Sequence, residues 1–257
     1  MDDYFLIGQR KFTSRLIIGS GKYKSFQETK NALDVSGAQM ITVAIARTNI
    51  GQDSNKENLL DYIDKDIYTI LPNTAGCFKA DEAVRVAMIA RELLETNLLK
   101  LEVLLDKKSL LPNESETLKA AEKLVKENFS VMVYTTQNIQ LAKDLENIGC
   151  DAIMPLGSQI GTGQGIKTPS NIRKIIEKAN VPVIVDAGIR TPSDASLAME
   201  MGCEAVLLNT SIAESKNPIK MAEAMKYAVK AGRLSYVAKA MKIKDEASPS
   251  SDKNSPL

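Results

Sequence analysis

A lysine and a glutamate interrupt an apolar run of this chain, residues 98–105. If the run forms a strand, its side chains alternate between two faces, and Lys100 and Glu102 share one face with Leu98 and Leu104. Burial among leucines disfavours the ammonium form of a lysine, and the neutral amine is a nucleophile toward carbonyl carbons. The Glu102 carboxylate favours the ammonium form, and we expect desolvation to outweigh it. The pair therefore predicts imine chemistry at Lys100, with an exposed ion pair on an edge strand as the alternative.

The segments on both sides of this run have the periodicity of helices. Residues 80–95 and 114–128 place apolar side chains at helical spacing among charges. Strands that alternate with helices form a parallel sheet, whose strands are covered on at least one face. An ionisable pair on such a strand therefore favours a functional role over a solvated surface.

The set of side chains that could transfer protons is limited, because the chain contains no histidine. Near neutral pH proton transfer falls to carboxylates, lysines, tyrosines, cysteines or water. Asp186 ends another apolar run, directly before Ala187 and Gly188. We expect its carboxylate to lie near the reacting atoms, although an aspartate at a strand end can also serve only as a turn residue.

The order of elements predicts the fold class, α/β with a (β/α)8 (TIM) barrel. Strand-like apolar runs recur eight times, at residues 16–18, 40–46, 67–71, 98–105, 131–134, 152–154, 181–185 and 205–208. Helical patterns follow at residues 25–36, 54–63 (weakly), 80–95, 114–128, 139–148, 169–178, 192–201 and 218–231. The length of 257 residues fits one such barrel. We predict a barrel domain over residues 1–241 with an N-terminal β-hairpin at residues 4–12, and a flexible tail over residues 242–257.

Composition excludes several classes of protein. Hydrophobic residues at 44% and charged residues at 25% are ordinary globular values, and a net charge of +1 gives no reason to expect nucleic acid or a membrane surface as a partner. Cys77, Cys150 and Cys203 are far apart, so neither a disulfide framework nor a zinc site is expected. With no signal-peptide pattern and no run of 18 apolar residues, we predict a cytoplasmic protein.

Glycine-rich loops follow the apolar runs, at residues 19–23, 72–76, 155–165 and 186–190. Barrel active sites form at the carboxyl ends of the strands, where these loops lie. Gly188 stands just before a helix at Pro192, and Asn209-Thr210 follow the eighth run. This arrangement matches the common barrel phosphate site after strands seven and eight, where backbone amides and a helix N-terminus bind the anion. The alternative is that the glycines only turn the chain.

Together these stretches resemble the thiazole synthase family of thiamin biosynthesis, over roughly residues 4–240. The motifs that carry the resemblance lie at residues 19–23 (GSGKY), 71–77 (LPNTAGC), 99–103 (LKLEV), 109–112 (SLLP), 154–157 (MPLG), 160–166 (IGTGQGI), 183–189 (VIVDAGI), 207–210 (LLNT) and 231–236 (AGRLSY). Nine motifs in this order make the resemblance specific.

The resemblance implies a barrel that condenses 1-deoxy-D-xylulose 5-phosphate, dehydroglycine and sulfur into a thiazole phosphate carboxylate, with no cofactor and no metal. The sulfur would arrive as a thiocarboxylate on the C-terminal Gly-Gly of a small ubiquitin-like sulfur carrier protein. By motif match, Lys100 forms the Schiff base and Glu102 and Asp186 are the acid and base groups. The implied sugar-phosphate ligands are Gly161, Ala187, Gly188, Asn209 and Thr210. A homotetramer is expected, in a bacterial cytoplasm or, for a plastid-encoded protein, in the stroma.

Two positions depart from the family pattern. Arg190 stands where a glycine is usual, and Ala46 precedes Arg47 where two arginines are usual. A positive φ at Arg190 would cost ~1–2 kcal/mol. A guanidinium there could instead pair with the phosphate.

Two other functions fit the same residues. A class I aldolase would also use a lysine imine on a phosphosugar in a barrel. A barrel that binds the sugar phosphate or the carrier without turnover is the second alternative. We further expect the glycine-rich segment at residues 157–165 to line the channel for the carrier's tail.

Overall fold

The computed structural model describes residues 3–250 and has eight parallel strands in the order β8-β7-β6-β5-β4-β3-β10-β9. These strands are β3 (Leu16–Gly19), β4 (Met40–Ala44), β5 (Thr69–Asn73), β6 (Leu98–Leu101), β7 (Ser130–Thr135), β8 (Ala152–Pro155), β9 (Ile184–Asp186) and β10 (Ala205–Leu208). Parallel bridges at Ile153–Val183 and Leu156–Asp186 join the two ends of the sheet. The strands therefore close into a ring, and the predicted (β/α)8 barrel is confirmed.

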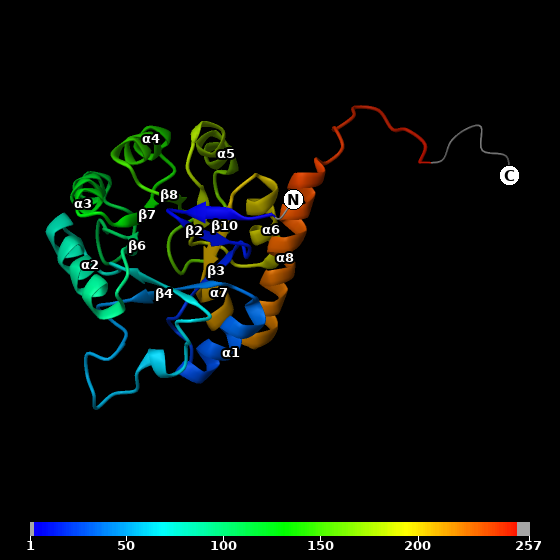
Figure 1. Ribbon diagram of the computed structural model, residues 1–257. Coiled ribbons are helices and arrows are strands. Elements are labelled where there is room, and N and C mark those ends of the chain that lie inside the picture. Colours follow the sequence, from blue (N-terminus) through cyan, green and yellow to red (C-terminus); the bar gives the residue numbers. More distant parts are fainter. Residues whose placement is uncertain (1–2, 251–257) are drawn as a thin grey trace.

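Helices surround the ring of strands (Figure 1). They are α1 (Phe26–Ser36), α2 (Ala80–Leu94), α3 (Glu114–Lys126), α4 (Ile139–Ile148), α5 (Pro169–Lys178), α6 (Pro192–Glu200), α7 (Thr210–Ala213) and α8 (Pro218–Ala238). The short α7 was not predicted from the sequence, because a single turn has too few residues for a periodic pattern. It follows β10 directly, in the place where many barrels bind phosphate.

The predicted helix over residues 54–63 is wrong. Only one 3-10 turn forms there, η1 (Leu59–Asp61), within a long connection from β4 to β5. The side-chain amide of Asn49 donates to the backbone carbonyls of Asp53, Lys56 and Glu57. These bonds hold the backbone in a compact loop and replace the hydrogen bonds that a helix would supply.

The strand that carries Lys100 is shorter than predicted. β6 ends at Leu101, and the chain then passes through isolated bridges, Cys77–Val103 and Leu104–Pro112. Of the leucines and the valine that alternate with Lys100 and Glu102, Leu99, Leu101 and Val103 are buried as a strand face would be, whereas Leu105 is 57% exposed. In contrast, α8 continues to Ala238, seven residues beyond its predicted end.

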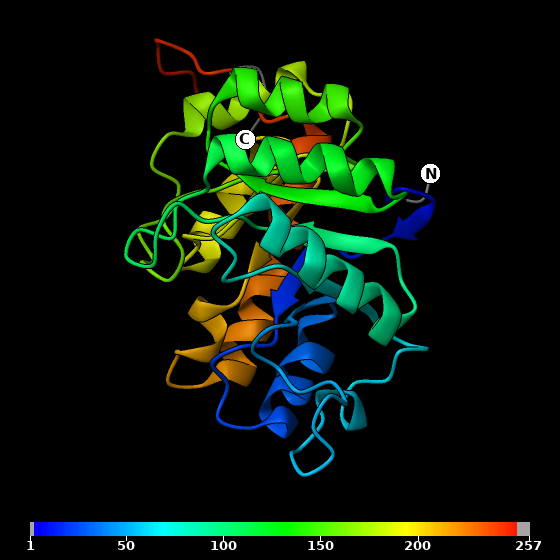
Figure 2. The same ribbon diagram turned by 90° about the vertical axis from the view of Figure 1, so that its left-hand side faces the viewer.

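The predicted N-terminal hairpin is confirmed, and it closes one end of the barrel. β1 (Phe5–Ile7) pairs antiparallel with β2 (Arg10–Phe12). Figure 2 shows the hairpin, in dark blue, at one end of the barrel. Apolar side chains of the hairpin pack with those that fill the barrel interior, including Ile17, Leu98 and Met132. The carboxyl ends of the strands are therefore left as the open end.

The structure describes all three cysteines and the first part of the segment predicted as a tail. Cys77, Cys150 and Cys203 are buried free thiols. Residues 239–250 follow α8 as exposed chain without helix or strand, whereas residues 251–257 of the predicted tail lie outside the described part. Among residues 3–250, no helix is both long and apolar enough to cross a membrane.

Candidate active site

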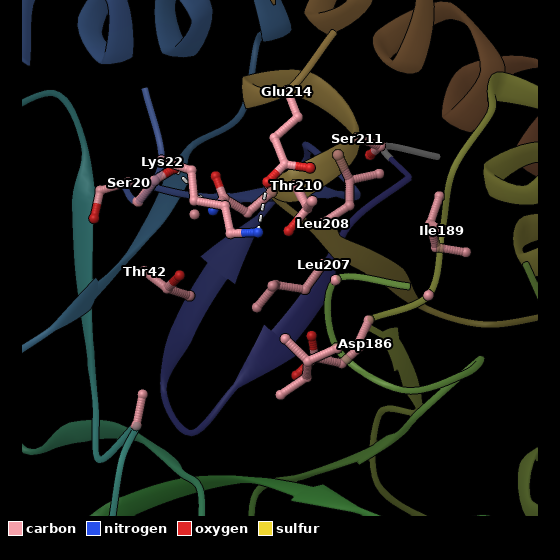
Figure 3. A pocket seen from close by; sticks show the side chains of 18 of the residues that line it. Ser20, Lys22, Thr42, Asp186, Ile189, Leu207, Leu208, Thr210, Ser211 and Glu214 are labelled. Atoms are coloured by element: carbon pink, nitrogen blue, oxygen red, sulfur yellow. Dashed lines mark hydrogen bonds and ion pairs between the residues drawn. The ribbon is translucent and has the colours of Figure 1, made fainter. Parts of the chain in front are cut away.

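A cavity of about 810 Å³ opens at the carboxyl ends of the strands (Figure 3). Every site residue predicted from the sequence lines it: Lys100, Glu102, Gly161, Asp186, Ala187, Gly188, Asn209 and Thr210. They come from β6 and the segment just after it, from the loop after β8, and from the ends of β9 and β10. Closure of the barrel therefore brings together groups that lie up to 110 positions apart in the chain, from Lys100 to Thr210.

Lys100 lies between two carboxylates at the bottom of the cavity. Its Nζ is 2.7 Å from Asp186 Oδ2 and 3.2 Å from Glu102 Oε2. The three residues are only 3–5% exposed. The ring of Tyr134, on β7, lies 5.2 Å from Nζ and forms an aromatic wall. A buried charge must be paired to be tolerated, and here each charge has a partner.

The backbone explains why these side chains meet. Lys100 is opposite Asn73 in the β5–β6 register. After β6 ends, the hydroxyl of Thr74 accepts a hydrogen bond from Glu102 N and donates one to Glu102 O, both at 2.8 Å. Thr74 belongs to the LPNTAGC motif, so this loop positions the glutamate that follows the adjacent strand.

The expectation that desolvation leaves Lys100 neutral is wrong. Burial does favour the neutral amine, but the attraction of Asp186 and Glu102 together exceeds it and raises the pKa of Lys100 above its ordinary value. The sequence pattern showed Glu102 and could not show that Asp186 would contact the same ammonium. The resting lysine is therefore protonated.

The same cluster supplies the group that can remove this proton. Burial raises the pKa of Asp186, because desolvation exceeds the stabilising effect of the Lys100 ammonium. A carboxylate with a raised pKa is a stronger base than an exposed aspartate. Asp186 Oδ2 already lies at hydrogen-bonding distance from Lys100 Nζ, so transfer needs no movement of the backbone.

An anion cradle lies above the lysine, formed by Gly161, Ala187, Gly188, Asn209 and Thr210. Ala187 and Gly188 both have positive φ, 66° and 80°. A Cβ at Gly188 would lie 2.4 Å from Ser158 N, so only glycine permits this approach of the two loops. The amides of Gly188 and Ile189 have no hydrogen-bond partner among residues 3–250, and they lie just before the N-terminus of α6. These are the features that bind anions.

The second half of the cradle is the start of α7. Its first-turn amides have no partner within the helix. The hydroxyls of Ser211 and Ser215 and the carbonyl oxygen of the Asn209 side chain are buried without a partner in the described residues, and all three side chains line the cavity. Hydroxyls that lack a partner inside a cavity are available to a ligand. Ser211 and Ser215 were missed from the sequence, because isolated serines in a segment without a periodic pattern give no signal.

The two departures from the family pattern, at Arg190 and Ala46, lie differently relative to the cavity. Arg190 does not have a positive φ, so the predicted strain there is absent. Its backbone amide donates to Asp194 Oδ2 at 3.0 Å, and its side chain lies along the cavity wall beside Gly163. Arg47 also lines the cavity, whereas Ala46 is exposed.

The fold and the site together define a class of protein. A buried lysine between two carboxylates, beneath an anion cradle at the carboxyl end of a (β/α)8 barrel, is the arrangement of an enzyme that forms imines with phosphorylated carbonyl compounds. Comparison with known proteins narrows this class.

The family profile described as "Thiazole biosynthesis protein ThiG" matches residues 6–252. The thiazole synthase of Pseudomonas aeruginosa (strain LESB58) is 58% identical over 251 residues, which cover 97% of this chain and 95% of that protein. The thiazole synthase of Aromatoleum aromaticum is 56% identical over 256 residues, which cover 98% of this chain and 98% of that protein. The crystal structure of the Amycolatopsis orientalis BexX/CysO complex superposes with a TM-score of 0.85 at 29% identity, over 96% of this chain and 100% of that one. The chain belongs to the ThiG family.

Removal of the Lys100 ammonium tests the charge balance of the site. In Lys100→Met, two buried carboxylates lose their shared partner, and we expect the free energy of unfolding at about pH 8 to fall by ~3–5 kcal/mol. The folded variant then binds a proton more tightly than the unfolded chain, where an aspartate has a pKa of ~3.9. Stability is therefore regained as the pH falls, and the deficit should shrink toward about pH 5.

Urea unfolding of the variant and the native chain at both pH values measures this effect. Lys107→Met, which removes an exposed lysine from the loop after β6, is the matched control and should show no such dependence. A deficit in Lys100→Met that is the same at both pH values would contradict the assignment.

Proposed function

We propose that this protein is a thiazole synthase that condenses 1-deoxy-D-xylulose 5-phosphate, dehydroglycine and carrier-bound sulfur into a thiazole phosphate carboxylate. The observation that carries the proposal is the contact of Lys100 Nζ with two buried carboxylates below the anion cradle. Membership of the ThiG family and 56–58% identity to thiazole synthases over nearly the whole chain support it. No step requires a cofactor, since imine formation and proton transfer use side chains.

The first step is attack of Lys100 on the ketone of the sugar phosphate. The phosphate binds in the anion cradle and directs the other end of the molecule toward the lysine. Asp186 accepts a proton from the ammonium, and the free amine adds to the carbonyl carbon. Loss of water then gives the imine, and the carboxylates stabilise its positive charge.

The second stage moves the carbonyl group along the sugar. A base removes a proton next to the imine carbon to form an enaminol, and an acid returns a proton at the neighbouring position. Glu102 and Asp186 both contact Lys100 and are the carboxylates available for these transfers at the bottom of the cavity. The carbonyl formed in this way accepts the sulfur.

Trapping of the imine tests the role of Lys100. Borohydride reduction of the protein with 1-deoxy-D-xylulose 5-phosphate should add the mass of the reduced sugar phosphate to the peptide that contains Lys100, as read by mass spectrometry. Lys107→Met is the matched control and should retain full labelling. Labelling that persists in Lys100→Met would assign the imine to another lysine.

Substitution of the carboxylates tests the proton transfers. Glu102→Gln and Asp186→Asn each remove a base while they retain the shape of the side chain, and each should lower turnover by ~10²–10⁴. Trapping at Lys100 should persist at least in part, because reduction captures even a slowly formed imine. If both variants kept native turnover in the complete assay, the acid–base roles would be wrong.

The alternatives can be separated by the same assays. A class I aldolase shares the lysine imine and the phosphate, but it would cleave the sugar phosphate in the absence of any sulfur donor. A barrel without turnover would give neither product, and without imine formation it would also show no trapping. The contact cluster of all three catalytic candidates argues against the barrel without turnover, and membership of the ThiG family argues against the aldolase.

We propose that the sulfur is delivered by a small carrier protein with a C-terminal thiocarboxylate. The similarity to BexX, which was crystallised with CysO, supports a protein donor. Ile160, Gly161, Thr162 and Gly163 line the cavity and would contact the carrier's tail. Gly165 has another role, since a Cβ there would lie 2.8 Å from Asp194 Oδ1.

Bulk in this loop tests the route of the tail. Thr162 is exposed and lines the cavity, so Thr162→Trp should lower sulfur transfer from the carrier thiocarboxylate by about tenfold or more, with sulfide less affected. Gln164→Trp, at an exposed neighbour that does not line the cavity, is the control. Equal losses with both sulfur sources, or no loss, would place the tail elsewhere.

Assembly and location follow the family. A homotetramer stays a prediction, and sedimentation at micromolar concentration would test it. We place the protein in a bacterial-type cytoplasm, supported by its bacterial relatives and by three cysteines that remain free thiols.

A further inference from the structure

An ion pair between Lys22 and Glu214 lies at the open edge of the cavity and takes no part in the imine chemistry proposed for Lys100. Lys22, in the loop between β3 and α1, donates from Nζ to Glu214 Oε1 at 2.7 Å. Glu214 follows α7 directly, and Figure 3 shows the Lys22 side chain extending across the cavity to reach it. Both residues line the cavity, with side chains 48% and 56% exposed.

The loop that carries Lys22 is attached to the anion cradle. The Asn209 side-chain amide donates to Gly21 O at 2.9 Å, and a Cβ on Gly19 would lie only 2.7 Å from Asn209 Cβ. Lys22 itself has a φ of 69°, in the left-handed region that lysine seldom adopts. Residues held in such conformations concentrate at ligand sites.

The ammonium of Lys22 also lies beside the other half of the cradle. Its Nζ is 3.7 Å from the position that a Cβ would take on Gly161. It therefore lies between the loop after β8 and the residue that follows α7. An anion bound on the amides of these elements would come within reach of this ammonium.

We propose that Lys22 is a ligand of the substrate phosphate and that Glu214 is its resting partner, which the phosphate displaces on binding. The proposal rests on the proposed function, since it adds a contact to the same phosphate. A dianionic phosphate attracts an ammonium more strongly than a single carboxylate does. Glu214 is exposed enough to turn into solvent when Lys22 changes partner.

The exchange explains how the site selects a phosphorylated sugar. An exposed ion pair contributes little to stability, so a phosphate can break it at small cost. A neutral hydroxyl at the same position cannot displace the carboxylate and gains nothing from Lys22. Lys22 therefore stays paired with Glu214 when an unphosphorylated sugar is bound.

Calorimetric titration of the full-length protein, at constant ionic strength, tests both residues. The probes are inorganic phosphate, 1-deoxy-D-xylulose 5-phosphate and unphosphorylated 1-deoxy-D-xylulose. Lys22→Met should weaken binding of both phosphates by roughly tenfold or more and leave the unphosphorylated sugar unchanged. Glu214→Gln should tighten phosphate binding about three- to tenfold, because Lys22 no longer has a competing partner.

The double variant separates exchange from simple repulsion. If Glu214 acts through Lys22, Glu214→Gln should have almost no effect in the Lys22→Met background. If Glu214 only repels the phosphate, its substitution should tighten binding equally in both backgrounds, and this result would overturn the exchange.

A matched control and a folding check complete the test. Lys24→Met removes an exposed lysine from the same loop that does not line the cavity, and it should not alter phosphate binding. Thermal unfolding identifies any variant that fails to fold, in which case Lys22→Gln replaces Lys22→Met. Unchanged phosphate affinity in a folded Lys22 variant would overturn the role of Lys22.

The proposed function can fail separately. Absence of imine trapping at Lys100 in a chain that binds phosphate through Lys22 would overturn the synthase chemistry and leave this phosphate contact established. A native chain that bound neither phosphate would overturn both.

Discussion

Two carboxylates and one ammonium share a site from which water is largely excluded, and the arrangement of the barrel depends on keeping them in contact. Lys100 lies on β6 and Glu102 directly follows its end, whereas Asp186 ends β9. Separation of these charges within the protein interior would leave each without a partner, which costs far more than their pairing gains. Closure of the strand ring keeps the three side chains within contact distance of one another. The hairpin covers the opposite end of the barrel, so ligands approach the cluster from the carboxyl ends of the strands.

The distribution of charge in the cavity gives a substrate its orientation. The buried cluster has one more negative than positive charge when all three groups are ionised. Lys22, Arg47 and Arg190 lie higher on the walls, and Lys22 and Arg190 are near the amides of the anion cradle. A molecule with a phosphate at one end and a ketone at the other is attracted at the wall and repelled from the carboxylates. Its carbonyl is then left to face the lysine.

The departure from the family pattern at Arg190 is accommodated by local hydrogen bonds. Arg190 replaces a usual glycine without strain, because the positive φ values of this loop fall on Ala187 and Gly188. Asp194 accepts hydrogen bonds from the backbone amides of Arg190 and Thr191, which holds the turn before α6 whatever the side chain at position 190. The loop backbone that forms the cradle is therefore independent of this substitution.

The sequence by itself determined the order of strands and helices, the hairpin, the barrel and the set of residues at the carboxyl ends of the strands. These follow from local periodicity and from the geometry of parallel strands, which each segment carries on its own. Only the tertiary structure decided that Asp186 contacts Lys100 and keeps it protonated, and that Lys22 pairs with Glu214 across the cavity. It also decided that residues 54–63 form a loop and that α7 exists. The charge state of a side chain and the partners that it contacts depend on which distant segments meet in space. A local sequence pattern does not contain that information.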